Sequence, residues 1–206
     1  MEYLLRWSGR RLMAAVLVLG VFTTGAQAAG EAQKPVLLFQ DALLHVMRQG
    51  QVLGFEGRRH YLAPVVDQAF DLPRITRAII GRYWDQLSSG DRQHLAGQIR
   101  AYALATLASR FDAYAGQAFT MGTQTPAGAF ALRIKSHFSG PDTDVALDYL
   151  VRRNAQGSWR ISNVWFDGVS GTDIQQKEFA SFLRKGGAAR LMAKLDEIIT
   201  NLGREG

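Results

Sequence analysis

The side chains that could carry out chemistry are few, and the most suggestive are the adjacent Asp148 and Tyr149. A carboxylate base and a tyrosine donor that both face an apolar pocket can isomerise a steroid-like ligand. The surrounding segment alternates in polarity as a β-strand does, and adjacent residues of a strand point to opposite faces. We therefore expect Asp148 in solvent and Tyr149 in the core, with no pocket shared between them.

Ser170 lies in the turn at residues 166–173, FDGVSGTD, between a predicted strand and a predicted helix. Such turns can present a nucleophile or hold a phosphate. The sequence contains no G-x-S-x-G, G-x-G-x-x-G or P-loop motif, and no base is evident near Ser170. We interpret Ser170 as a turn or helix-start residue, and Gly168 and Gly171 as residues that the backbone conformation needs.

Metal and thiol chemistry are not favoured either. The chain has no cysteine, which excludes a disulfide framework, a thiolate nucleophile and a Cys-based zinc site. Asp142 and Asp144 suit the turn beside Pro141 better than a cation site. We expect no catalytic residue, no metal and no cofactor. The four histidines do not have the spacing of metal ligands: His45, His60, His94 and His137.

The N-terminus has the features of a secretory signal peptide. Three arginines precede an apolar run at residues 12–22, and Ala26-Gln27-Ala28 then supplies a small-x-small cleavage pattern. The run is too short to cross a bilayer, which needs about 20 apolar residues. We predict that residues 1–28 are a signal peptide cleaved near Ala28, and that residues 29–206 form a single exported domain.

The charge of the mature chain is mildly basic. Removing three Arg and one Glu from the 24 basic and 18 acidic residues leaves 21 and 17, a net charge of +4. Such a balance favours an anionic membrane surface or an acidic partner. Export and the lack of a block of like charges argue against nucleic acid. Three basic pairs are expected on the solvated surface: Arg58-Arg59, Arg152-Arg153 and Arg184-Lys185.

The periodicity of the chain predicts helices, then strands, then helices. Apolar residues recur at helical spacing in the first half and at the C-terminus, where Gly186-Gly187 interrupts the pattern. Between them, alternation and turn residues predict about four antiparallel strands. We therefore predict an α+β fold in which helices cover a twisted sheet and enclose an apolar hollow. The predicted helices span residues 36–48, 60–69, 73–80 and 90–114, and the predicted strands lie near 117–124, 130–135, 145–152 and 159–165.

Several segments, taken in order, resemble the MlaC family, also called toluene-tolerance auxiliary proteins. The resemblance covers nearly all of the predicted mature chain and depends on the ordered set rather than on one motif. The stretch FDLP at residues 70–73 is also similar to the hopanoid-associated branch, HpnM. The segments are 60–68 (HYLAPVVDQ), 70–77 (FDLPRITR), 80–84 (IGRYW), 89–92 (SGDR), 159–164 (WRISNV) and 167–170 (DGVS).

The resemblance implies a periplasmic carrier that binds the acyl chains of a phospholipid in a cavity between sheet and helices. The implied partners are an inner-membrane ABC transporter with its substrate-binding subunit and an outer-membrane lipoprotein complex, between which the protein would shuttle lipid. On this interpretation the FDGVS turn lies at the cavity mouth and Val169 contacts the lipid. The further lining residues that we predict are Tyr83, Leu107, Phe111, Tyr149, Val164 and Phe166.

Two alternatives remain open from the sequence. One is a hopanoid-linked or other apolar-ligand carrier, which differs in its cargo and not in its mechanism. The other is a small enzyme of the same cone-like architecture, which would need a polar dyad inside the hollow. The pattern of residues does not identify the cargo, because an apolar core and an apolar cavity have the same sequence signature.

Overall fold

A computed structural model describes residues 23–205 of the chain. The predicted signal peptide, residues 1–28, lies outside the described residues except for its last few, which form the start of the first helix. None of the described helices is both long and apolar enough to span a membrane. Helices occupy both ends of the described chain: α1 (Thr23–Arg48), α2 (Gly50–Ala69), α3 (Leu72–Ile80), the 3₁₀ helix η1 (Gly81–Gln86), α4 (Ser89–Arg110) and α5 (Gly171–Glu205).

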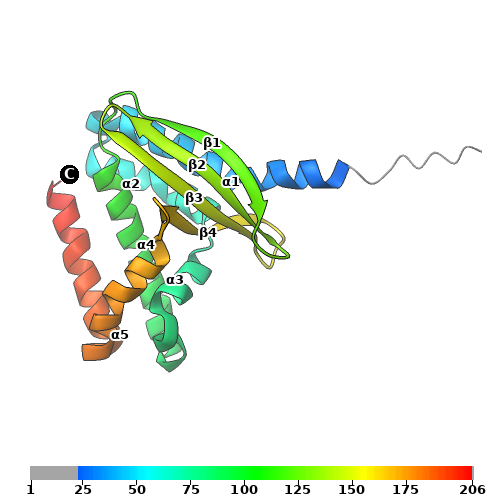
Figure 1. The fold of residues 1–206 in the computed structure, drawn as a ribbon. Helices are drawn as coiled ribbons and strands as arrows, with labels where there is room; N and C mark the ends of the chain where they lie inside the picture. The colour runs from blue at the N-terminus through cyan, green and yellow to red at the C-terminus, as the bar shows by residue number, and fades with distance from the viewer. Residues whose placement is uncertain (1–22, 206) are drawn as a thin grey trace, which may run out of the picture.

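The strands form one antiparallel sheet in which each strand pairs with its neighbour in the chain, in the order β1-β2-β3-β4-β5. The helices lie on one side of this sheet (Figure 1). This arrangement confirms the predicted α+β class and the four predicted strands. The fifth strand was missed, because two residues are too few to show alternation. The strands are β1 (Ala118–Pro126), β2 (Ala131–Gly140), β3 (Thr143–Arg153), β4 (Trp159–Phe166) and β5 (Val169–Ser170).

Helix ends follow local signals that the sequence carries. The Ser88 side chain accepts a hydrogen bond from the backbone N–H of Asp91 at 3.0 Å and so caps α4. Asp71 caps α3 in the same way, and Pro73 lies in the first turn of that helix, where its missing N–H removes no helical bond. The break predicted in the last helix is confirmed, because Gly186 and Gly187 have non-helical backbone angles.

The first two helices are longer than predicted. The sequence predicts the first helix from residue 36, but α1 runs through Pro35, because Ala32 before the proline and Val36 after it are both fully buried on one face. Helix α2 begins at Gly50 and bends at Gly54, whose φ of 58° lies in the left-handed region. At Pro35 burial of an apolar face against the rest of the protein outweighs a local helix-breaking residue, whereas Gly54 interrupts α2 between two helical segments.

The described interior contains two main apolar clusters, which α4 joins. The sheet core lies between α1, α2, the end of α4 and the inner face of the sheet, and its buried members include Leu43, Leu62, Ile134 and Val151. The helix core lies between α3, α4 and α5, and is built around residues such as Ile79, Leu95 and Leu191. The inner face of the sheet therefore has a core of its own, separate from the packing of the last helix.

One expectation about surface charge was wrong. Arg58, predicted on the solvated surface, is only 2% exposed. Its Nε donates to the carbonyl oxygen of Ala108 at 2.7 Å, and its Nη1 donates to the carbonyl oxygen of Gly50 at 2.7 Å. The buried guanidinium satisfies the Ala108 carbonyl near the C-terminal end of α4, where a positive charge is favoured, and the Gly50 carbonyl at the start of α2. Arg58 thus links the middle of α2 to the start of the same helix and to the end of α4.

Candidate functional site

Four of the predicted lining residues lie side by side on the inner face of the sheet. Tyr149 on β3 pairs with Val164 on β4, and one row further along Leu147 pairs with Phe166, which pairs in turn with Val169. The burial of this face changes along the strands. Tyr149 is 1% exposed, whereas Phe166 and Val169 are 50% and 54% exposed. The apolar inner face is therefore continuous from the sheet core to solvent at the β4–β5 end.

The turn at this exposed end is tightly held. Asp167 and Gly168 both have positive φ, 48° and 81°, as a two-residue hairpin turn requires. The Asp167 carboxylate accepts a hydrogen bond from the backbone N–H of Ala146 at 2.9 Å, and its own N–H donates to the Ala146 carbonyl oxygen at 2.9 Å. These bonds tie the turn to β3 and hold Phe166 and Val169 in place.

Ser170 behaves as a helix-start residue, as predicted. It is 7% exposed, its hydroxyl oxygen accepts from the Asn163 amide at 2.9 Å, and it also accepts from the backbone N–H of Asp173 at 3.3 Å. Gly171 is needed for close packing, since a Cβ there would lie 3.2 Å from the Val164 carbonyl oxygen and 3.4 Å from the Phe166 ring. The turn thus shapes an apolar corner and presents no activated nucleophile.

The remaining predicted residues divide between the two cores. Leu107 and Phe111, at the end of α4, pack against the sheet core, and the Phe111 ring centroid lies 5.9 Å from that of Phe138 on β2. Tyr83 packs instead against the helix core, next to α3, α4 and α5. The structure therefore brings six of the seven predicted residues to one face or edge of the sheet and leaves Tyr83 apart.

A buried polar cluster lies in the middle of this apolar face, and it was not foreseen. The Gln40 amide nitrogen on α1 donates to the Ser136 hydroxyl at 2.9 Å and to the Tyr149 hydroxyl at 3.2 Å. Ser136 in turn donates to the Thr120 carbonyl oxygen at 3.0 Å. All three side chains are at most 6% exposed. Because an unpaired buried polar group is costly, these bonds favour one position of α1 on the sheet.

Asp148 lies on the opposite face of the sheet from Tyr149, which confirms that the two cannot form a catalytic dyad. Its carboxylate lies 3.5 Å from Nη1 of Arg133, and the Arg133 guanidinium carbon lies 4.0 Å from the centroid of the Trp165 ring. These three side chains form a charged and aromatic group on the outer face. The charge of Asp148 is thereby paired with that of Arg133 on the outer face, and the carboxylate has no access to the inner face.

Metal ligation has no support within residues 23–205, where no group of three or more His, Asp or Glu side chains is close enough to share an ion. The histidines make other contacts. His45 stacks on the ring of Tyr61 with centroids 4.3 Å apart, and His137 pairs with Asp144 on the outer face of the sheet. The two histidines therefore have structural partners.

The sequence profile described as "MlaC protein" matches residues 39–197 of the chain, which include every helix and strand named above except the outer ends of α1 and α5. The chain belongs to the MlaC family. Among solved structures, the fold of this MlaC-family chain is similar to that of the phospholipid-binding protein from Ralstonia solanacearum, which was determined in complex with a phospholipid. The two chains are 23% identical with a TM-score of 0.70, over 84% of this chain and 98% of the other.

The buried tyrosine of this MlaC-family protein is expected to make its stability depend on pH in the alkaline range. Burial raises the pKa of Tyr149 to about 12, and the hydrogen bond from Gln40 opposes part of that rise. The pKa of tyrosine in an unfolded chain is about 10. Tyr149 therefore makes its full contribution to stability below pH ~10. About 2–3 kcal/mol of the free energy of unfolding is lost as the pH rises to ~12, because the unfolded chain loses the tyrosine proton first.

Tyr149→Phe tests this linkage, because it removes the proton but keeps the ring. Urea unfolding of the wild type and the variant between pH 9 and 12 is expected to show a steeper loss of stability in the wild type. If the free energy of unfolding fell equally with pH in the two proteins, the assignment of the alkaline transition to Tyr149 would be contradicted.

Proposed function

We propose that the protein is a periplasmic carrier that binds the acyl chains of a phospholipid between the sheet and the helices. The observation that carries this proposal is the continuity of the inner face from Tyr149, which is covered, through the partly buried Val164 to Phe166 and Val169, which are half exposed. An acyl chain that enters at the β4–β5 end would meet mainly apolar side chains on its way to the sheet core, with the Gln40–Ser136–Tyr149 cluster as the polar exception. The bound phospholipid of the structural relative agrees with this class of ligand.

The energetics suit a carrier without catalytic activity. Removing one acyl chain of about fifteen methylenes from water is favourable by about 12 kcal/mol, at ~0.8 kcal/mol for each CH₂. A membrane offers the lipid nearly the same gain. Transfer between the membrane and the protein is therefore close to balanced, and the direction of transport depends on the partners.

The interior of the described structure is well packed, so binding requires movement. Leu62, Ile134 and Val151 are fully covered by neighbouring side chains. A lipid chain can reach them only if α1 or α2 moves away from the sheet. The Gln40–Ser136–Tyr149 bonds oppose that movement, and their loss in the open form would be offset by burial of the acyl chain.

The partners proposed for this carrier are those that the family resemblance implies. Lipid would pass between an outer-membrane lipoprotein complex and the substrate-binding subunit of an inner-membrane ABC transporter. A hopanoid is the alternative cargo, because the covered face is apolar and contains one small polar cluster, a composition that suits a rigid apolar ligand as well as an acyl chain.

The proposal is tested by purifying the protein from a Gram-negative periplasm for native mass spectrometry and lipid extraction. A stoichiometric phospholipid in the extract is the expected result. A hopanoid in its place would keep the carrier mechanism and change the cargo. A folded protein that is empty and cannot take up added lipid would overturn the proposal.

A further inference from the structure

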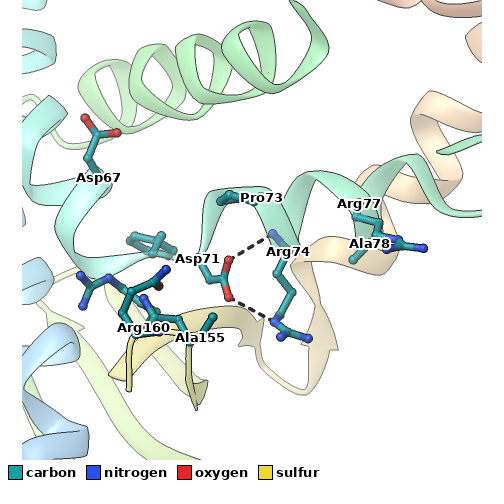
Figure 2. Close-up of a pocket in the computed structure, with 11 residues that line it drawn as sticks. Asp67, Asp71, Pro73, Arg74, Arg77, Ala78, Ala155 and Arg160 are labelled. Atoms are coloured by element: carbon teal, nitrogen blue, oxygen red, sulfur yellow. Dashed lines mark hydrogen bonds and ion pairs between the residues drawn. The ribbon is translucent and has the colours of Figure 1, made fainter. Parts of the chain in front are cut away.

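The second feature with a ligand-binding character lies at the other end of β4, where α2 and α3 meet the β3–β4 hairpin. The start of α3 is joined to β4 there, because Asp71 donates its backbone N–H to the Ile161 carbonyl oxygen at 2.8 Å. A pocket of about 790 Å³ opens beside this contact (Figure 2). Its polar and charged lining residues include Asp67, Asp71, Arg74, Arg77, Asn154 and Arg160.

This pocket is distinct from the acyl entrance proposed above. Arg160 lies at the start of β4 and Phe166 at its end, and six residues of strand span about 20 Å. The pocket also differs in chemistry, since three arginines line it beside apolar groups such as those of Phe70 and Pro73. An anionic group would find several N–H donors here, from the guanidinium groups of the three lining arginines.

Most of the charges around the pocket are matched in pairs. Arg100, from outside, binds both oxygens of Asp67 at 2.6 Å, and this hydrogen bonding raises the pKa of Arg100 above its ordinary value. Arg74 binds Asp71 through Nε at 3.1 Å, as the dashed line in Figure 2 shows. Nη2 of Arg77 lies 3.6 Å from Oδ1 of Asp85. These pairs leave neither of the two lining carboxylates free to balance a further cation.

Two arginines are not matched. Arg160 donates one N–H to the carbonyl oxygen of its neighbour Trp159, and Arg152 lies directly across from Arg160 in the register of β3 and β4. Within residues 23–205 neither guanidinium has a carboxylate at ion-pair distance. Like charges at directly opposed positions of a sheet are destabilising, so an anion bound there would remove an existing repulsion.

We propose that this pocket, hereafter the arginine pocket, binds a phosphate group through Arg160, with Arg152 and the unused N–H donors of Arg74 close by. Guanidinium groups match phosphate oxygens in planar, paired hydrogen bonds. The amide side chains of Asn154 and Gln156 on the hairpin can add donors. The phosphate could belong to a lipid headgroup at a membrane surface or to a soluble phosphate compound, and both share this chemistry.

The test follows backbone amide resonances of the purified protein by NMR at about 0.15 M salt, where exposed charges are screened beyond ~8 Å. Glycerophosphoglycerol and inorganic phosphate are titrated separately, and vesicles of phosphatidylglycerol are used in a flotation assay. Saturable shifts at residues 154–160 are expected with a phosphate compound, and Arg160→Gln is expected to weaken binding about tenfold. Arg74→Gln provides a second variant on the other wall of the pocket.

Arg184→Gln is the matched control, since Arg184 is an exposed arginine on α5, remote in sequence from the pocket. Binding of glycerophosphoglycerol and vesicles points to a lipid headgroup, and binding of inorganic phosphate alone points to a soluble source; either supports the pocket. No saturable shift, equal weakening by Arg184→Gln, or stronger binding of a glutamate-rich peptide than of any phosphate compound would overturn it. Acyl loading, measured separately, is expected to be unchanged in Arg160→Gln, so failure of this proposal is distinguishable from failure of the carrier proposal.

Discussion

Val169→Glu is expected to abolish lipid loading while leaving the protein folded. Val169 is 54% exposed at the end of the inner sheet face, so a carboxylate there remains in water when no lipid is bound. We expect the free energy of unfolding to change by less than about 0.5 kcal/mol. A bound acyl chain would cover the same position and remove the carboxylate from water. A penalty of about 3 kcal/mol or more would lower loading over a hundredfold.

The measurement is the amount of phospholipid extracted per protein after purification, together with the thermal midpoint. Val169→Leu is expected to load normally, because it keeps an apolar side chain at the mouth. Val52→Glu is the matched charge control, since Val52 on α2 is 85% exposed and lies outside both cores. Normal loading of Val169→Glu would show that the β4–β5 end is not where the acyl chain lies.

Arg58→Met is expected to produce the largest loss of stability among the single substitutions considered. Methionine keeps much of the side-chain volume but leaves the carbonyl oxygens of Ala108 and Gly50 without their donor. Two buried unsatisfied acceptors are expected to cost about 3 kcal/mol in the free energy of unfolding. For a domain of this size the thermal midpoint would fall by about 6–12 °C.

Arg59→Met separates this effect from a general loss of positive charge. Arg59 forms an exposed pair with Glu56 at 2.8 Å, and the Glu56 side chain is 76% exposed. Such a pair contributes at most about 1 kcal/mol. Unfolding in urea measures both variants, and a loss for Arg58→Met no larger than that for Arg59→Met would show that the buried contacts of Arg58 are not important for stability.

The sequence predicted the elements whose periodicity is long and regular. Leu191 and Leu195, from the apolar stripe at the C-terminus, are fully buried in the helix core, and the alternation around Tyr149 predicted both the strand and its inner face. Local chemistry also sufficed at Gly186-Gly187, because a glycine pair acts on the backbone of its immediate neighbours.

Features that depend on distant partners could not be predicted. Gln40 lies 109 residues from Tyr149 in the chain, and nothing in its own neighbourhood indicates that it is buried. Arg58 looked like a surface residue because its carbonyl partners are main-chain groups, which have no sequence signature. The arginine pocket was missed for the same reason, since the pairing of Arg152 with Arg160 depends on the register of two strands.

The topology of the sheet sets the order in which the protein can fold. Every strand pairs with the strand next to it in the chain, so loop closure is short and the sheet can assemble early. Helix α1 is the opposite case, because it comes first in the chain and docks on strands that come last. Its buried face, with Val36, Leu43 and Val46, therefore waits for the sheet, and a chain that emerges N-terminus first needs protection of this helix from aggregation until β4 has followed.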